Sequence, residues 1–227
     1  MSSRYSAPSF TQAATSSGGG CLSGYLLPPL AVVCVGAVLI FFALGSTNPP
    51  VPVEIQSRGT PLTLSPVFTP EVQYWAGRIQ VWAAAVGLDP NLVATVMQIE
   101  SCGDPRARSR AGAMGLFQVM PYHFAAGDDP YAPDTNALRG LDYLKRSLEA
   151  ALGDPRLALA GYNGGIGVVS QSEIAWAAET QRYAYWGSGI YAEASSAASE
   201  SLRLQEWLAA SGVSLCRQAH DRLGINP

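Results

Sequence analysis

Beyond residue 70, apolar residues recur every three to four positions, which is the spacing of one helix face. The first such stripe runs from Val72 to Val86 and stops at Gly87, a residue type that commonly ends helices. No stretch alternates apolar and polar residues between hairpin turns, as a strand would. The pattern therefore predicts an all-α domain over residues 71–227. Further helices are expected over 90–100, 134–152, 155–163, 179–194 and 200–223, with Asp134 and Asp154 as N-caps and a break near Gly212.

The pattern is different at the N-terminal end of the chain. Residues 25–45 contain no charged side chain and approach the ~20 apolar residues that span a bilayer as a helix. We expect this segment to be a membrane anchor; the alternative is a signal peptide cleaved before Ser46, because small residues precede that position. Residues 1–24 are rich in Ser, Ala, Gly and Thr, which predicts a disordered tail. Residues 46–70 hold six prolines, which is typical of a semi-extended linker.

Composition and charge narrow the classes of function. The chain has 227 residues, of which 48% are hydrophobic and 14% charged, enough for one ordinary core. Residues 46–227 carry 13 basic and 17 acidic side chains, a net charge of −4. That balance lacks the positive footprint of a nucleic-acid-binding protein, so no nucleic-acid partner is expected. His123 stands alone and predicts no metal site, and no cofactor is expected.

A single acidic residue ends the second apolar stripe. Asp89 and Pro90 have the identities of an N-cap and a first helical residue, and an apolar face over 92–97 follows them. Glu100 lies three to eight residues beyond those apolar positions, so its carboxyl is expected to project from the buried side of the helix. A carboxyl desolvated there has a raised pKa and can act as a general acid near neutral pH. The alternative is a glutamate at a solvated helix end.

Four short motifs bear on these alternatives. They are Glu100-Ser101 with Pro105, Ser109 with Gly112-Ala113, Gly115-Leu116-Phe117-Gln118 and Met120-Pro121, then Gly161-Tyr162-Asn163-Gly164-Gly165, and finally Glu179-Thr180 with Tyr183. In order and spacing, over about residues 75–195, they resemble the lytic transglycosylase (SLT) domain of the goose-type lysozyme-like family. Two departures remove no chemical group: glycine replaces both alanines of the third motif, and Phe117 replaces a methionine. The resemblance implies a lysozyme-like helical fold with a deep cleft.

The resemblance also implies an activity. The family cleaves the glycan strands of bacterial peptidoglycan, and the match makes Glu100 a single acid/base. Its product is a 1,6-anhydromuramoyl sugar, because the C6 hydroxyl of N-acetylmuramic acid attacks C1 while the N-acetyl group stabilises the oxocarbenium ion. Ser101 and Tyr183 are expected to brace the site. The positions expected to bind substrate are Ser109, Met114, Gln118, Tyr162, Asn163 and Glu179, with core packing as the alternative for Tyr162 and a helix C-cap for Asn163.

Other functions stay open at this point. A hydrolytic muramidase uses a second carboxylate, for which Asp104 and Glu179 are the candidates. A wall-binding protein that keeps the fold without turnover does not need an acid, so Glu100, Ser109, Gln118 and Asn163 argue against it. A membrane scaffold organised by the N-terminal segment is a further alternative. The basic residues Arg106, Arg108 and Arg110 are either a solvated loop or a contact for anionic stem peptides or glycan oxygens.

The expected state of the cysteines depends on the compartment in which the domain lies. A peptidoglycan substrate places the part of the chain after residue 45 outside the cytoplasm, where disulfides persist. We expect Cys102 and Cys216 to form one, pinning the turn after Glu100 to the C-terminal helix; the alternative is two free thiols. Cys34 lies inside the apolar segment and is expected to be a small hydrophobe.

Overall fold

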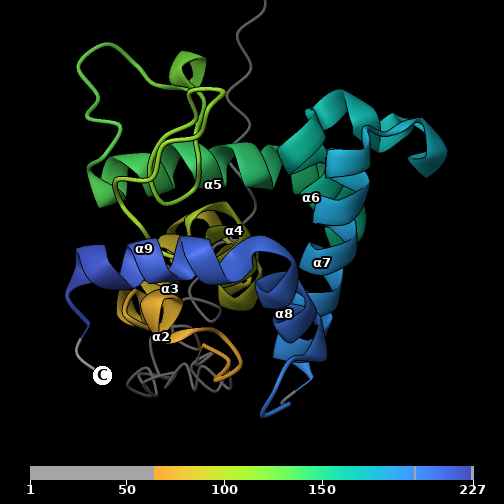
Figure 1. The fold of residues 1–227 in the computed structure, drawn as a ribbon. Coiled ribbons are helices and arrows are strands. Elements are labelled where there is room, and N and C mark those ends of the chain that lie inside the picture. Colours follow the sequence, from red (N-terminus) through yellow and green to blue (C-terminus); the bar gives the residue numbers. More distant parts are fainter. Residues whose placement is uncertain (1–63, 197, 226–227) are drawn as a thin grey trace, which may run out of the picture. The chain divides into compact units, whose positions relative to one another are not determined.

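The computed structural model describes residues 64–196 and 198–225, which are helices joined by loops (Figure 1). Within these ranges no strand forms, and only isolated bridges join Arg108 to Met114 and Met114 to Val119. The predicted all-α class is therefore confirmed. The α-helices are α2 (Pro70–Gln73), α3 (Ala76–Val86), α4 (Pro90–Ser101), α5 (Pro133–Ala150), α6 (Pro155–Gly164), α7 (Ala178–Ser195), α8 (Leu202–Trp207) and α9 (Val213–Leu223); the short turns are η1 (Pro121–His123), η2 (Ile166–Ser170), η3 (Glu173–Ala175) and the π-helical η4 (Leu208–Gly212).

Helix α4 is the central element of the domain. Its first nine residues, from Pro90 to Gln98, are all buried. In Figure 1 α4 lies between α5 and α9 in height and farther from the viewer. Helices α7 and α3 pack against it. The predicted cap is confirmed, since the Asp89 side chain accepts a hydrogen bond from the Asn91 backbone N–H at 2.7 Å. A buried helix of this kind fixes whatever side chain its last turn presents.

The start of α5 differs from the sequence prediction. Asp134 was expected to be its N-cap, but the helix begins at Pro133, so Ala132 occupies the cap position and no side chain caps it. Proline is favoured in the first turn because it has no N–H to satisfy there. Asp134 instead accepts hydrogen bonds from Arg78 and from the Trp82 indole on α3, the latter at 2.8 Å. The cap expected at Asp154 is confirmed, because its carboxylate accepts from two backbone N–H groups of α6.

Residues 64–70, which the sequence assigned to the linker, pack against the domain. Leu64, Val67 and Phe68 are buried in its hydrophobic core. The Ser65 backbone N–H donates to Oδ1 of Asn91 on α4 at 2.9 Å. Apolar side chains at three of these positions, among only two prolines, account for the difference. The predictions for residues 1–24, 25–45 and 46–63 lie outside the described residues.

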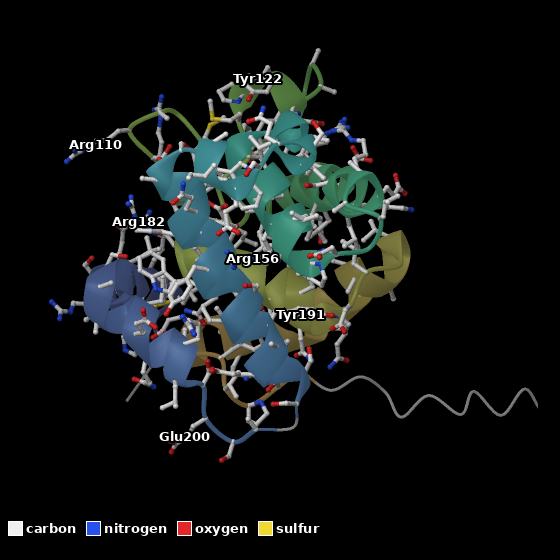
Figure 2. The ribbon with its side chains drawn as sticks, turned by 90° about the vertical axis from the view of Figure 1, so that its right-hand side faces the viewer. Arg110, Tyr122, Arg156, Arg182, Tyr191 and Glu200 are labelled. Carbon is white, nitrogen blue, oxygen red and sulfur yellow. A yellow bond between two sulfur atoms is a disulfide. The ribbon has the colours of Figure 1, made fainter. Side chains whose placement is uncertain are left out.

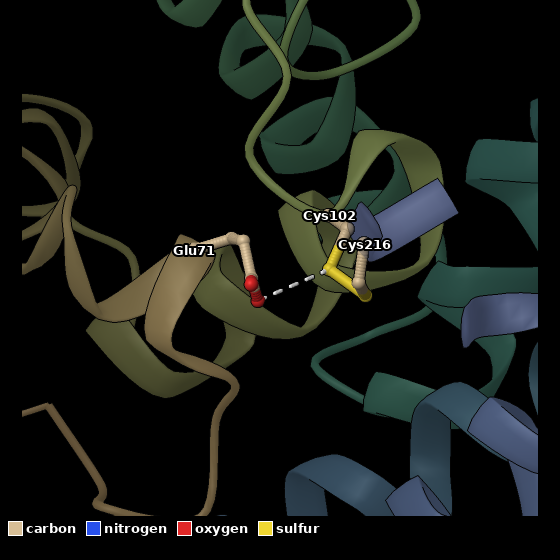
Figure 3. Close-up of side chains that lie close together, drawn as sticks. All are labelled: Glu71, Cys102 and Cys216. Atoms are coloured by element: carbon tan, nitrogen blue, oxygen red, sulfur yellow. Dashed lines mark hydrogen bonds between the residues drawn. A yellow bond between two sulfur atoms is a disulfide. The ribbon is translucent and has the colours of Figure 1, made fainter. Parts of the chain in front are cut away.

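The C-terminal helices are joined to α4 by the predicted disulfide. Cys102 and Cys216 are bonded, which confirms the pairing, and Cys102 itself ends α4 with a left-handed φ of 51°. Figure 3 shows Glu71 beside the bond, with one carboxylate oxygen 4.0 Å from Cys102 Sγ. Its other oxygen lies 3.1 Å from His220 Nδ1 on α9. The side chains of Glu71, Cys102 and Cys216 are close enough to one another to ligate one metal ion. However, sulfurs joined in a disulfide are not thiolate ligands.

The helix break expected near Gly212 is the π-helical turn η4, which lies between α8 and α9. Within residues 64–196 and 198–225, no single helix is both long enough and apolar enough to span a membrane. The consecutive helices α3 and α4 reach that length and composition only when taken together, and they are bent by 119° relative to each other.

Candidate active site

Glu100 lies in the last turn of α4, where the buried helix meets the loop over residues 103–120. Its side chain is half-buried and faces a cavity of about 380 Å³. The neighbouring Ser101 is fully buried and connects the helix to this loop. Its hydroxyl donates to the Leu116 carbonyl at 2.7 Å and accepts from the Gly103 N–H at 3.1 Å. Ser101 therefore holds the loop against the turn that carries Glu100.

A tight turn between Met114 and Val119 shapes the rest of the loop. The two residues exchange backbone hydrogen bonds of 2.9 and 3.0 Å, and Gly115 between them has a φ of 75°. Asn136 on α5 supports this turn by donating to the Met114 carbonyl at 2.7 Å and accepting from the Phe117 N–H at 2.8 Å. A Cβ on Gly115 would clash with the Asn136 amide, so the close approach requires glycine.

Five of the six residues expected to bind substrate line this cavity together with Glu100. Tyr162 donates from its hydroxyl to the Phe117 carbonyl at 2.7 Å, so the cavity-lining phenol also braces the loop. The Asn163 amide oxygen accepts from the Thr180 hydroxyl at 2.9 Å. Asn163 lies within α6, which ends one residue later, so it is not the C-cap. The five are Ser109, Gln118, Tyr162, Asn163 and Glu179.

Met114, the sixth of these residues, is not part of the cavity lining, and its backbone carries the turn described above. Tyr183, expected to brace the site, is buried and lines a second cavity together with Glu100. The basic residues Arg106, Arg108 and Arg110 are exposed and line neither cavity; Figure 2 shows Arg110 projecting away from the helices.

The second cavity, of about 640 Å³, shares Glu100, Asn163 and Glu179 with the first. Its other walls come from α4, α7, α8 and η4. Because both cavities are lined by these three residues, we describe the cavities as two arms of one cleft that meet at Glu100. A chain-like ligand would thus contact the protein on both sides of this carboxyl.

The electrostatics of the cleft favour a protonated Glu100. Burial raises the pKa of its carboxyl to about 8; the hydroxyl of Tyr183 opposes this shift, and the charge of Glu179 adds to it. Burial and the nearby Glu100 also raise the pKa of Tyr162 and of Tyr183, so both phenols stay neutral. Glu100 therefore enters the neutral pH range holding a proton, as a general acid must.

Of the two candidates for a second carboxylate, only Glu179 lies in the cleft. Asp104 is fully buried outside both cavities, where it accepts from Gln218 at 2.7 Å and pairs with Arg222 at 3.1 Å. Its role is to attach α9 to the loop after α4. Asp104 is therefore ruled out as a group that directs water at this site.

The sequence analysis missed an aromatic wall of the first arm. Tyr122, His123 and Tyr143 line the cavity, and the ring centroids of successive pairs lie 4.6 and 4.7 Å apart. Burial and the charge of Arg146 lower the pKa of His123, so its imidazole is neutral at pH 7. The sequence did contain a signal for this wall. Tyr122 and His123 directly follow Met120-Pro121, the end of a motif that was expected to border the cleft.

Parts of the chain are similar in sequence to known proteins. Residues 77–184 match the family model of the transglycosylase SLT domain. Over 116 residues the chain is 37% identical to a transglycosylase of Enterobacteria phage PRD1, covering 48% of this chain and 42% of that protein. Over 72 residues it is 36% identical to the endo-type membrane-bound lytic murein transglycosylase A of Klebsiella pneumoniae, covering 30% of this chain and 34% of that protein.

Among solved structures, an inactive mutant of the lytic transglycosylase Slt from Pseudomonas aeruginosa aligns with a TM-score of 0.45 and 25% identity, covering 55% of this chain and 25% of that one. The chain thus spans less than half the length of each of these three proteins.

Proposed function

Starting from the premise that residues 77–184 are a transglycosylase SLT domain, we propose that this chain is a lytic transglycosylase that cleaves peptidoglycan glycan strands. The bond cleaved is the β-1,4 linkage between N-acetylmuramic acid and N-acetylglucosamine. The observation that carries the proposal is Glu100, a carboxyl with a pKa raised to about 8 at the junction of two cleft arms. A strand lying along both arms presents its glycosidic oxygen to that carboxyl.

In the first step Glu100 protonates the leaving glycosidic oxygen. Positive charge develops at C1 of the muramoyl sugar, and its own N-acetyl group stabilises the oxocarbenium ion. Tyr162 and Asn163 line the cleft beside Glu100. In this mechanism they hold the sugar and acetamido groups. Ser109 and Gln118 line the same arm from the loop. The rigid α4 and its braced loop keep these groups in position for the acid.

In the second step the Glu100 carboxylate acts as base. It removes the proton from the C6 hydroxyl, whose oxygen forms the bond to C1 and closes a 1,6-anhydro ring. Glu100 thereby regains its proton, and no water is consumed. One residue serves both steps, which agrees with a cleft that offers a single buried acid.

A hydrolytic muramidase is the second candidate. Glycosidases that act with water commonly pair two carboxylates. Glu179 lines both arms with Glu100 and its charge adds to the raised pKa of Glu100, so it is the residue placed to direct a water molecule. The two mechanisms predict products that differ by one water.

Mass spectrometry of muropeptides distinguishes these functions. We expect purified peptidoglycan treated with the full chain to release muropeptides about 18 Da lighter than hydrolysed ones, because the anhydro ring replaces the elements of water. A lysozyme digest of the same material supplies the hydrolysed reference masses. Products with free reducing ends would establish a muramidase, and the absence of any product would favour a wall-binding or scaffold role.

The rate is expected to fall with rising pH through about 8. The acid form of Glu100 is required for the first step, and its raised pKa keeps that form present below this pH and removes it above. Above the pKa, kcat/KM should drop by about tenfold per pH unit, as for one essential proton. Initial rates on soluble strands from pH 5 to 10 measure this. An activity that is flat or rises across pH 8 would contradict the assignment of Glu100 as acid.

We also propose that residues 25–45 anchor the chain in a membrane, with the SLT domain on the extracytoplasmic side. Their uncharged length and the extracytoplasmic substrate support this arrangement. The Klebsiella relative is described as membrane-bound. If residues 25–45 were a cleaved signal peptide instead, the mature chain would begin near Ser46 and fractionate without the membrane.

A further inference from the structure

The second arm of the cleft is built largely by residues outside the catalytic motifs. Its side walls come from α7, from the end of α8 and from the π-helical turn η4. The residues after 184 also lie outside the segment that matches the SLT family model. Arg182 lies inside that segment but is not one of the motif residues, and the lining residues after it are Trp186, Trp207, Ala210 and Ser211.

The π-helical turn gives this arm its shape. Gly212 ends the turn, and a Cβ there would clash with the six-membered ring of Trp207. The glycine therefore lets the indole lie flat against the turn, where it is 3% exposed and forms part of the cavity wall. Ala210 and Ser211 in the same turn line the cavity beside it. π-Helical turns inside helices occur frequently at functional sites.

Three hydrogen-bond donors of this arm lack partners. Arg182 is exposed at its edge, and no ion pair holds it anywhere in the described ranges, although Glu179 precedes it by one helical turn (Figure 2). The indole nitrogen of Trp186 and the hydroxyl of Tyr183 are buried without a hydrogen-bond partner among the same residues. The guanidinium and the indole only donate, and the hydroxyl can donate as well. A ligand that suits this arm therefore brings acceptor oxygens.

The guanidinium selects among acceptors. Its planar fork matches a carboxylate with two parallel hydrogen bonds, which are stronger than those to neutral oxygens. The sugars of a glycan strand are otherwise uncharged, and their carboxylates belong to the muramoyl substituent. This substituent is either the stem peptide or, after peptide removal, the free lactyl group. The carboxyls that line the cavity are Glu100 and Glu179, and Arg182 is the one cation among the described residues that line it, so it is the group available to such a ligand.

We propose that the second arm binds a carboxylate on the muramoyl substituent of the strand, with Arg182 as its main contact. This inference rests on the proposed function, since it assumes a glycan strand in the cleft. It assigns to α7, α8 and η4 a role in substrate selection: strands that carry muramoyl carboxylates are preferred over neutral glycans of the same length. Arg182 is here a specificity residue and takes no part in proton transfer.

Binding to a variant that cannot turn over tests the proposal. Dissociation constants are measured by calorimetry for the full chain carrying Glu100→Gln, with three oligosaccharides of equal length. These are N-acetylglucosamine oligomers, peptide-free muramoyl strands and strands bearing stem peptides. Arg182→Met is added to one sample, and Arg217→Met, an exposed arginine on α9 that lines neither cavity, is added to the matched control.

The carboxylate-bearing strands are expected to bind about tenfold more tightly than the neutral oligomer, which is the size of one charge-assisted contact. Arg182→Met should abolish this preference, while Arg217→Met preserves it. A preference for the peptide-free strand alone would assign the contact to the lactyl carboxylate, and a preference for the peptide-bearing strand alone would assign it to the stem. A preference for both would mean that Arg182 accepts either carboxylate.

Equal affinity for all three ligands, or a preference that survives Arg182→Met, would overturn the proposal. This measurement needs no product, so its failure is separate from that of the proposed function. If the unmutated chain released anhydro products while the preference was absent, the activity would stand and the role of the second arm would fall. Binding of none of the three ligands would overturn both.

Discussion

Replacement of Glu100 by glutamine is expected to lower turnover of peptidoglycan at least ~100-fold, the low end for loss of a general acid. Glutamine keeps the shape of the side chain and its hydrogen-bonding capacity but has no proton to give at neutral pH. Burial holds the pKa of the native carboxyl at about 8, so at pH 7 the substitution removes an acid that is present in its active form. Release of soluble muropeptides from purified sacculi, at equal protein concentrations, measures the loss.

Stability separates this effect from misfolding. The folded state raises the pKa of Glu100 above its unfolded value, so folding is favoured most when the group is protonated and loses stability as pH rises towards about 8. The neutral glutamine avoids that loss. The Glu100→Gln variant should therefore melt at or above the temperature of the native chain at pH 8, with a smaller difference at pH 5.

The matched control is Glu179→Gln, which removes the other carboxyl of the cleft. A single acid/base mechanism predicts a smaller loss than for Glu100→Gln and no change of product mass. Near-native turnover by Glu100→Gln would contradict the mechanism. A loss of equal size in both variants, with reducing-end products from the native chain, would favour the muramidase in which Glu179 directs water.

The sequence predicts those parts of the fold that depend on local signals. Asp89-Pro90 and Asp154-Pro155 start helices as expected, since an N-cap acts on backbone groups two or three residues away. The failure at Asp134 has a non-local cause: its carboxylate is taken by Arg78 and Trp82 of α3, more than fifty residues earlier. A capping rule considers only residues near the helix start, so it cannot predict partners this far away in the sequence.

The same distinction applies to the site. Glu100, Gln118 and Tyr162 belong to motifs that can be read from the chain, and the structure brings them to one cavity. Asn136 belongs to no motif, yet its amide holds the loop through hydrogen bonds to the backbone of Met114 and Phe117 and makes a third to the Pro130 carbonyl. The second arm could not be predicted from the sequence either. Gly212 indicates where a helix is interrupted, but it does not indicate which cavity that interruption borders.

Removal of the Cys102–Cys216 disulfide is expected to destabilise the domain by about 2–5 kcal/mol, the usual range for a native bridge. The bond closes a loop with a sequence separation of 114, so its loss releases a large amount of chain entropy in the unfolded state. The double variant Cys102→Ala and Cys216→Ala keeps the left-handed position 102 occupied by a residue with a Cβ, so backbone strain is matched. Midpoints of denaturant unfolding measure the difference.

Activity in the same variant reports a second consequence. Cys102 lies two residues after Glu100, and the bond ties that turn to α9. Without it α9 is held by noncovalent contacts, among them those of Asp104 with Arg222 and of Glu71 with His220. We therefore expect kcat to fall before the fold is lost, because the turn that carries the acid is less firmly positioned. The control, Cys21→Ala with Cys34→Ala, should change neither quantity. An unchanged midpoint in the double variant would mean that these polar contacts alone suffice to hold α9 on the turn after Glu100.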